Sequence, residues 1–236
     1  MSDCFRSIIL IGRPAAGKSE IIDFLKSTPS AERRERFHIG DLVEIDDFPF
    51  LWEKFQEDDI LEAQGRPRLW TTSDYYFTDA WFWNFMILKI NHAYDRLAAE
   101  RGRRETALVE FSRGGSEGFR EAFSVLSEPI RRDSGLIYLR VSYEESVRKN
   151  RRRARAGAEH SILHHSLPDA KMEHYYKTND WEAVSGGRSE GAIDMGGIGV
   201  PFVVFENEPE VTDRPESLGE RLEDVCRRLW ARRTSG

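Results

Sequence analysis

Short runs of consecutive apolar residues alternate along the chain with longer segments in which apolar residues recur at helical spacing. Each run is about five residues long, which is typical of strands that are buried on both faces of a parallel sheet. The runs predict five strands, at Ser7–Ile11, Leu42–Ile45, Ala107–Phe111, Gly135–Val141 and Pro201–Phe205. Helices between the strands would cover both faces, so the pattern predicts an α/β fold with three αβα layers.

Helical spacing and end signals predict the segments that cover this sheet. Glu20–Ser27 is expected to be a helix, and Ser217–Arg233 a C-terminal helix that packs on the sheet. Asp74 is positioned to cap a long helix that ends near residue 101. Ser185–Gly199 is rich in glycine, which favours a mobile loop.

Composition narrows the class of protein. Hydrophobic residues make up 39% of the 236 residues and charged residues 32%, which excludes disordered and fibrous chains. The net charge of -6 argues against a surface that coats nucleic acid or anionic membrane, so a polyanion site must be local. The longest near-apolar run, Ala80–Leu88, is too short to cross a bilayer. Cys4 and Cys226 make no disulfide framework, and we expect a cytoplasmic protein; a homodimer is left open.

One motif carries specific chemistry. The segment after the first strand fits GxxxxGK[ST], a pattern whose backbone N–H groups cradle phosphate. Its lysine would reach the β- and γ-phosphates and its serine would ligate Mg²⁺, while the helix that follows offers its positive end to the anion. The motif comprises Gly12, Arg13, Pro14, Ala15, Ala16, Gly17, Lys18 and Ser19.

Other features of the sequence limit the choice among P-loop proteins. The base-reading motif NKxD of GTPases is absent, and the third strand ends in Glu110 rather than in the Asp-Glu pair of motor and AAA-type ATPases. Three further features point to a different class of P-loop protein. They are the P-loop at the extreme N-terminus, the acidic pair after strand two and the arginine-dense helix after strand four. With these residues, the chain resembles the P-loop nucleoside and nucleotide kinases, especially deoxynucleoside and thymidylate kinases, over nearly all of its length.

The resemblance implies a sheet order of 2-3-1-4-5 and transfer of the γ-phosphoryl group of ATP, with Mg²⁺, to a small acceptor, by preference a nucleoside or nucleotide. In these kinases an acidic residue after strand two contacts the acceptor, and Asp47 or Asp46 matches it, with Asp47 preferred. An acidic residue and an arginine follow strand three; Glu110 and Arg113 match them, although Phe111 and Ser112 intervene. In that sheet order Glu110 lies beside Ser19, where both could hold Mg²⁺.

The arginine run Arg148–Arg155 matches the lid that these kinases fold over the phosphates. A capping box, Ser142-x-x-Glu145, predicts that the run starts on a helix. At helical spacing Arg148, Arg152 and Arg155 share one face, where like charges would repel unless an anion were present. A lid at about 143–185 is therefore the expectation.

A long insert at about 48–106 separates strands two and three within what we predict to be a single kinase domain. It is rich in Trp, Tyr and Phe, whose faces could stack on an acceptor base, although such a stripe is more often core. No Cys accompanies the histidines at 160–174, so no His-based metal site is predicted.

Two alternative functions, from other classes of protein, remain open. In a nucleic-acid-associated P-loop ATPase, the arginine run would bind the phosphates of RNA or DNA. A nucleotide-binding regulatory module would hydrolyse little. The acidic composition favours the kinase with a small-molecule acceptor.

Overall fold

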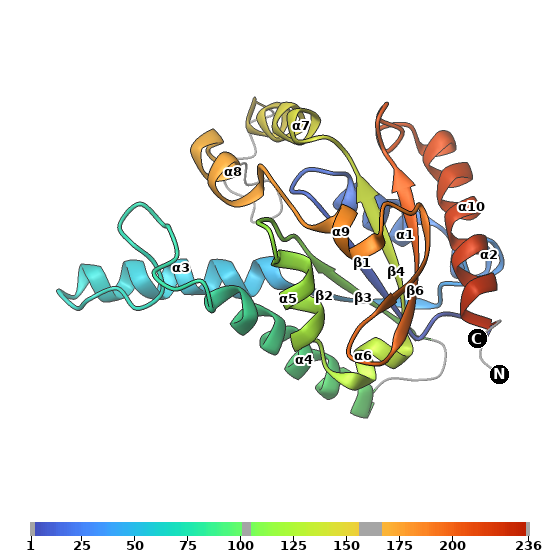
Figure 1. The fold of residues 1–236 in the computed structure, drawn as a ribbon, viewed down its shortest axis with the longest axis horizontal. Helices are drawn as coiled ribbons and strands as arrows, with labels where there is room; N and C mark the ends of the chain where they lie inside the picture. Colours follow the sequence, from blue (N-terminus) through green and yellow to red (C-terminus); the bar gives the residue numbers. More distant parts are fainter. Residues whose placement is uncertain (1–2, 101–104, 156–166, 235–236) are drawn as a thin grey trace.

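The computed structural model, which describes residues 3–100, 105–155 and 167–234, contains a six-stranded sheet with helices on both faces (Figure 1). The strands are β1 (Ser7–Gly12), β2 (Asp41–Asp46), β3 (Glu105–Phe111), β4 (Ser134–Arg140), β5 (Glu190–Asp194) and β6 (Gly199–Glu206). The helices are α1 (Lys18–Ser27), α2 (Ser30–Phe37), α3 (Asp47–Ala63), α4 (Phe82–Glu100), α5 (Gly118–Val125), α6 (Glu128–Asp133), α7 (Tyr143–Arg155), α8 (Asp169–Tyr176), α9 (Trp181–Ser185) and α10 (Pro215–Thr234).

Alternate residues of the central strands point to opposite faces of the sheet, so each strand contributes side chains to two hydrophobic cores. Ile9 and Ile11 of β1 pack in one cluster with buried residues of α4 and α5. Ile8 and Leu10 pack in the other, against α1, α2 and α10. The predicted three-layer arrangement is confirmed by these two clusters. The predicted C-terminal helix is confirmed as α10, which contacts β4 and β6.

The predicted number of five strands is wrong, because the sheet has six, although the five predicted strands are parallel and keep the predicted order among themselves. The sheet has the order β2-β3-β1-β4-β6-β5, and its additional edge strand, β5, pairs antiparallel with β6. β5 lies inside the glycine-rich segment expected to be a loop. Its sequence, Glu-Gly-Ala-Ile-Asp, lacks an apolar run because an edge strand pairs through its backbone and buries little.

The helix expected to start at Asp74 begins instead at Phe82, and the insert also contains α3, which the sequence pattern did not predict. Residues 71–77 form a small turn in which Thr71 bridges Phe77 and Thr72 N donates to Tyr76 O. The fully buried Asp58 of α3 binds this segment, because its carboxylate accepts backbone N–H groups of residues 69–71. Local hydrogen bonds thus hold the chain in a non-helical conformation between Asp74 and the start of α4.

The parallel strands end at one edge of the sheet, which places their last residues together. Ile11 pairs with Phe111, and Asp46 pairs with Glu110, in the registers of β1 with β3 and of β2 with β3. Residues that follow β1, β2 and β3 therefore converge although they are far apart in the sequence. In the described part of the chain, no helix is both long and apolar enough to cross a membrane.

Candidate functional site

The P-loop turns tightly between β1 and α1, and its glycines are required by close packing. A Cβ on Gly12 would lie 2.8 Å from Leu139 O. Gly17 has φ +115°, and a Cβ there would lie 2.6 Å from the Asn207 amide nitrogen. No side chain caps α1, so its first backbone N–H groups are available to an anion.

The remaining P-loop residues fix the loop against its surroundings. The amide of Asn207 donates to Ala16 O at 2.7 Å, and Ser146 Oγ of α7 donates to Pro14 O at 2.7 Å. The guanidinium of Arg13 donates to Tyr176 O at the end of α8, and burial lowers its pKa. Arg13 thus connects the loop with α8. Pro14, Ala15, Lys18 and Ser19 line a cavity beside the loop.

Lys18 reaches from α1 to the end of β3. Its ammonium donates to Ser112 Oγ at 2.8 Å and lies 3.7 Å from the Glu110 carboxylate. With only 6% of its surface exposed, Lys18 is pre-positioned beside the P-loop. Ser112 was not singled out from the sequence; its place directly after the third strand was the available signal.

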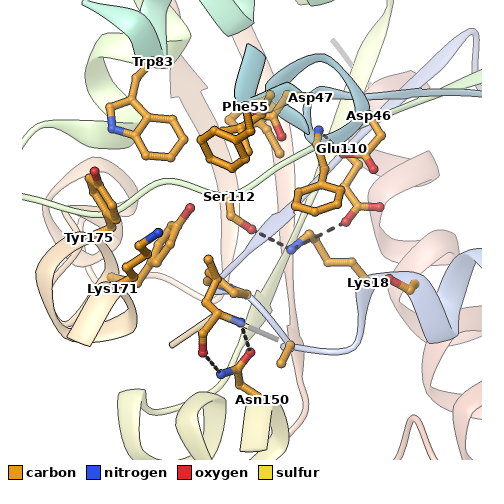
Figure 2. Close-up of a pocket in the computed structure, with 18 of the residues that line it drawn as sticks. Lys18, Asp46, Asp47, Phe55, Trp83, Glu110, Ser112, Asn150, Lys171 and Tyr175 are labelled. Atoms are coloured by element: carbon orange, nitrogen blue, oxygen red, sulfur yellow. Dashed lines mark hydrogen bonds and ion pairs between the residues drawn. The ribbon is translucent and has the colours of Figure 1, made fainter. Parts of the chain in front are cut away.

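Three carboxylates meet at the ends of β2 and β3: Asp46, Asp47 and Glu110 (Figure 2). Burial, together with the negative charges of Glu110 and Asp47, raises the pKa of Asp46 to about 8. Burial also raises the pKa of Asp47 and of Glu110 above their ordinary values. Asp46 caps α3 by accepting the Phe48 N–H at 3.0 Å. The three carboxylates therefore have too little positive charge around them to balance their own negative charge.

Asp47 and Arg113 form a buried ion pair, 2.6 Å from Nη1 to Oδ2. Arg113 also donates to Ser112 O and to Trp83 O, and its guanidinium lies 4.9 Å from the centre of the Trp83 ring. The structure thus brings together the two predicted residues despite the two-residue spacer after Glu110. Arg113 thus links Asp47 at the start of α3 with Trp83 of α4.

The oxygen-rich donor set fits Mg²⁺. Ser19, Asp46 and Glu110 line the same cavity beside the P-loop, and the raised pKa of both carboxyls marks a place where a cation would relieve repulsion. Among the described residues, no group of three or more His, Cys, Asp or Glu side chains is placed to hold a metal ion by itself. Mg²⁺ usually takes one or two carboxylates and completes its shell with phosphate and water.

An aromatic cavity extends from the carboxylates toward α3, α4 and α8. Figure 2 shows Phe55 and Trp83 over it, with Lys171 and Tyr175 on the side away from Lys18 and Glu110. The insert expected to hold the acceptor therefore supplies part of its wall, and α8 supplies another. The aromatic lining residues are Phe48, Phe55, Tyr75, Phe77, Trp83, Phe111, Tyr175 and Tyr176.

The arginine run lies on α7, as predicted, but its charges are paired. Arg148 and Arg152 bind the carboxylate of Glu210, at 3.4 and 2.8 Å, and are about half exposed. Neither lines the cavity, and the side chain of Arg155 lies outside the described part of the chain. The expected mutual repulsion is thus wrong, because sequence spacing along one helix does not reveal Glu210 from another segment.

A different face of α7 points into the site. Arg153 lines the cavity with Lys18 and pairs with Glu20 of α1 at 2.9 Å. Asn150 also lines it, but both ends of its amide bind the backbone of Leu167. The predicted capping box is half formed: Ser142 Oγ accepts the Glu145 N–H, whereas the Ser142 N–H donates to Glu208.

Comparisons with known proteins give structural neighbours only. No family model and no curated protein matches the sequence. A sugar kinase from Janibacter sp. HTCC2649 aligns over 94% of both chains at 12% identity, with a TM-score of 0.44. A protein from Chloroflexus aurantiacus j-10-fl, provisionally assigned as a kinase, covers 95% of this chain and 99% of its own at 14% identity, TM-score 0.46. The shikimate kinase of Acinetobacter baumannii in complex with shikimate covers 73% of this chain and 76% of its own, at 14% identity and TM-score 0.35. The neighbours include kinases, but likeness at these values carries no conclusion about activity.

Proposed function

We propose that the protein is a P-loop kinase that transfers the γ-phosphoryl group of ATP to a hydroxyl group of a small acceptor. One observation carries the proposal: Lys18 and Ser19 of the P-loop share a cavity with Asp47 and with an aromatic wall. Such a cavity can hold a phosphate donor and an organic acceptor side by side. Phosphoryl transfer requires mainly this positioning and the stabilisation of charge.

Each side chain has a role that follows from its position. The N–H groups of the P-loop and Lys18 would bind the donor phosphates. Ser19, with Glu110 and Asp46, would hold Mg²⁺, which when bound neutralises charge on those phosphates. Arg153, which lines the cavity, is a further candidate for contact with them.

Asp47 is the carboxylate that we assign to the acceptor. It is held by Arg113 beside Trp83, whereas Asp46 caps α3 and faces Glu110. The acceptor oxygen would form the new bond to phosphorus as the bond to the β-phosphate oxygen breaks. Its proton would pass to Asp47, whose raised pKa suits a general base.

The negative charge at the end of the cavity where phosphoryl transfer would occur favours a hydroxyl over a phosphate as the attacking group. Asp46, Asp47 and Glu110 would repel a second phosphate, and the positive charge of Arg113 is already paired with Asp47. The group that attacks is therefore expected to be a hydroxyl, as in a nucleoside, rather than a phosphate, as in a nucleotide.

The nucleic-acid-associated ATPase receives less support. Its binding surface would be the arginine run, yet Arg148 and Arg152 pair with Glu210, and Arg151 pairs with Asp169 at 2.6 Å. A nucleic acid would have to displace these carboxylates. A regulatory module, the third reading, makes no use of a buried carboxylate beside an aromatic cavity.

The test is a phosphate-transfer assay with labelled ATP and Mg²⁺ against a panel of nucleosides, nucleoside monophosphates and other alcohols. The proposal expects a labelled product that depends on an acceptor hydroxyl and disappears in Asp47→Asn. Release of phosphate without an acceptor, stimulated by RNA or DNA and unchanged in Asp47→Asn, would instead identify the ATPase.

A further inference from the structure

Lys171 of α8 extends into the aromatic cavity without a carboxylate partner among the residues that the structure describes. Its ammonium lies 5.1 Å from the ring centre of Tyr75 and 5.5 Å from that of Tyr76. Burial lowers the pKa of Lys171, because its charged form loses solvent, and the charge of Asp74 offsets this only in part. In the described residues, this part of the cavity wall therefore carries a positive charge that forms no ion pair.

The other cations of the cavity wall have partners. Lys18 lies 3.7 Å from Glu110, and Arg153 lies 2.9 Å from Glu20. Lys171 is thus the lining cation, within the described ranges, whose charge is left for a ligand. Cation–π contacts with two tyrosines hold the ammonium in place but leave its hydrogen-bonding capacity unused.

Lys171 lies at the end of the cavity opposite the reaction centre. Lys171 and Tyr175 are four residues apart on α8, so they share a helix face. In Figure 2 both lie away from Glu110 and Lys18, and Trp83 lies on the same side of the cavity as they do. A molecule that extends from the carboxylates to Lys171 must therefore cross an aromatic surface.

Two of the polar groups along this surface are already engaged by the protein. The Asn150 amide is occupied by the backbone of Leu167, and the hydroxyl of Tyr75 donates to Asp59 at 3.0 Å. A polyhydroxylated acceptor could not use these two groups, and each of its hydroxyls that stayed unpaired would be costly. A flat apolar body, in contrast, would pack against the rings.

We infer that the acceptor is an aromatic alcohol with an anionic group at the end opposite its reactive hydroxyl, and that Lys171 binds this anion. The hydroxyl end of this inference rests on the proposed function, whereas the anion site does not. Lys171 would then select the acceptor rather than take part in phosphoryl transfer. If Lys171 served only to pack on the tyrosines, the charge of the acceptor would not matter.

Matched small molecules test this. We would measure binding of 4-(hydroxymethyl)benzoate and of 4-(hydroxymethyl)benzamide by calorimetry, because they differ in charge but little in shape. The acid should bind about tenfold more tightly than the amide, as expected for a charge-assisted contact at a half-buried site. 4-(Hydroxymethyl)phenyl phosphate, measured in parallel, distinguishes a preference for phosphate from one for carboxylate.

Variants identify the residue responsible. Lys171→Gln should remove the preference for the acid, and Lys171→Arg should retain it. Lys177→Gln is the matched control, because Lys177 lies just after α8, is 58% exposed and pairs with Glu173. The amide should bind all four proteins equally, which would show that the cavity has kept its shape.

The outcomes separate the inference from the proposed function. Equal binding of acid and amide to the wild type, a preference that survives in Lys171→Gln, or no binding of either probe would overturn the anion site. A preserved preference with no phosphate transfer from ATP to the bound acid, or to any other alcohol, would overturn the kinase and leave the anion site standing.

Discussion

Arg113 and Asp47 form an ion pair, 2.6 Å from Nη1 to Oδ2, with 3% and 7% of their surfaces exposed. The arginine follows β3 and the aspartate begins α3, so the contact joins two elements at the edge of the sheet where the P-loop lies. Arg113 also donates to Trp83 O of α4. A single guanidinium thus sets the position of the proposed base relative to the acceptor cavity.

Arg113→Met should destabilise the protein, by about 3–5 kcal/mol, because it leaves the Asp47 carboxylate buried without its partner. The free energy of unfolding from urea titrations measures this. Arg120→Met is the control, since Arg120 is 60% exposed and pairs with Glu117. The double variant with Asp47→Asn should regain part of the loss; no recovery would mean that Arg113 acts through packing alone.

Lys18→Met should lower phosphate transfer by about 100-fold or more, because the charge that faces the donor phosphates is removed from a preorganised, buried site. Lys26→Met on the same helix removes a charge that is 50% exposed and pairs with Glu44. That control should retain nearly full turnover. Comparable turnover in both variants would exclude Lys18 from the reaction.

The unliganded protein should lose stability as pH rises between about 4 and 8. Burial and neighbouring charges raise the pKa of Asp46 to about 8, above its unfolded value, so the folded state binds its proton more tightly. The stabilisation from this tighter proton binding is complete at pH values below the pKa of Asp46 in the unfolded chain. It is lost as pH approaches 8, and we expect the loss to be on the order of a few kcal/mol. Urea titrations at pH 5 and pH 8 measure the difference.

Asp46→Asn should flatten this dependence on pH while keeping the cap of α3, because asparagine also caps helices well. Mg²⁺ should reduce the dependence in the wild type by stabilising the ionised carboxylates. An Asp46→Asn protein with the same pH profile as the wild type would assign the effect to Glu110 or Asp47 instead.

The parts of the fold that follow from buried periodicity could be predicted from the sequence. β1, β3, β4 and β6 are apolar on both faces, and α10 repeats apolar residues on one face, so each is visible as a pattern. β5 was missed because hydrogen bonds to β6 define it, and these depend on chain segments that a local pattern does not contain. The turn held by Asp58 displaced the start of α4 for the same reason.

Part of the candidate site could likewise be predicted from the sequence, and part could not. The P-loop is contiguous, and the residues after β2 and β3 are placed by the parallel sheet, so Lys18, Asp47 and Arg113 could be brought together from the sequence. The contribution of Lys171 could not, and Arg153, although part of the predicted lid run, could not be distinguished from Arg148 and Arg152. Both depend on which faces of α7 and α8 are turned toward the cavity. Glu210 escaped notice because its partners lie about 60 residues earlier in the chain.

Arg153, rather than Arg148 or Arg152, should be the residue of α7 on which turnover depends. Arg153 lines the cavity with Lys18 and Ser19, whereas Arg148 and Arg152 bind Glu210. Hydrogen bonds and charge from Arg152 and Lys149 lower the pKa of Glu210 to about 2. To reach a phosphate, Arg148 or Arg152 would have to leave this carboxylate. Steady-state turnover of the three single alanine variants compares them directly.

Arg153→Ala should reduce kcat about tenfold or more, because a cation that lines the site can follow the charge that redistributes in the transition state. Arg148→Ala and Arg152→Ala should change kcat by less than about threefold, since half-exposed pairs contribute little. Urea titrations confirm that all three variants fold. If Arg152→Ala loses as much turnover as Arg153→Ala, while Glu210→Gln leaves kcat unchanged or raises it, then Glu210 releases a lid arginine onto the donor. That result would restore the lid face predicted from helical spacing.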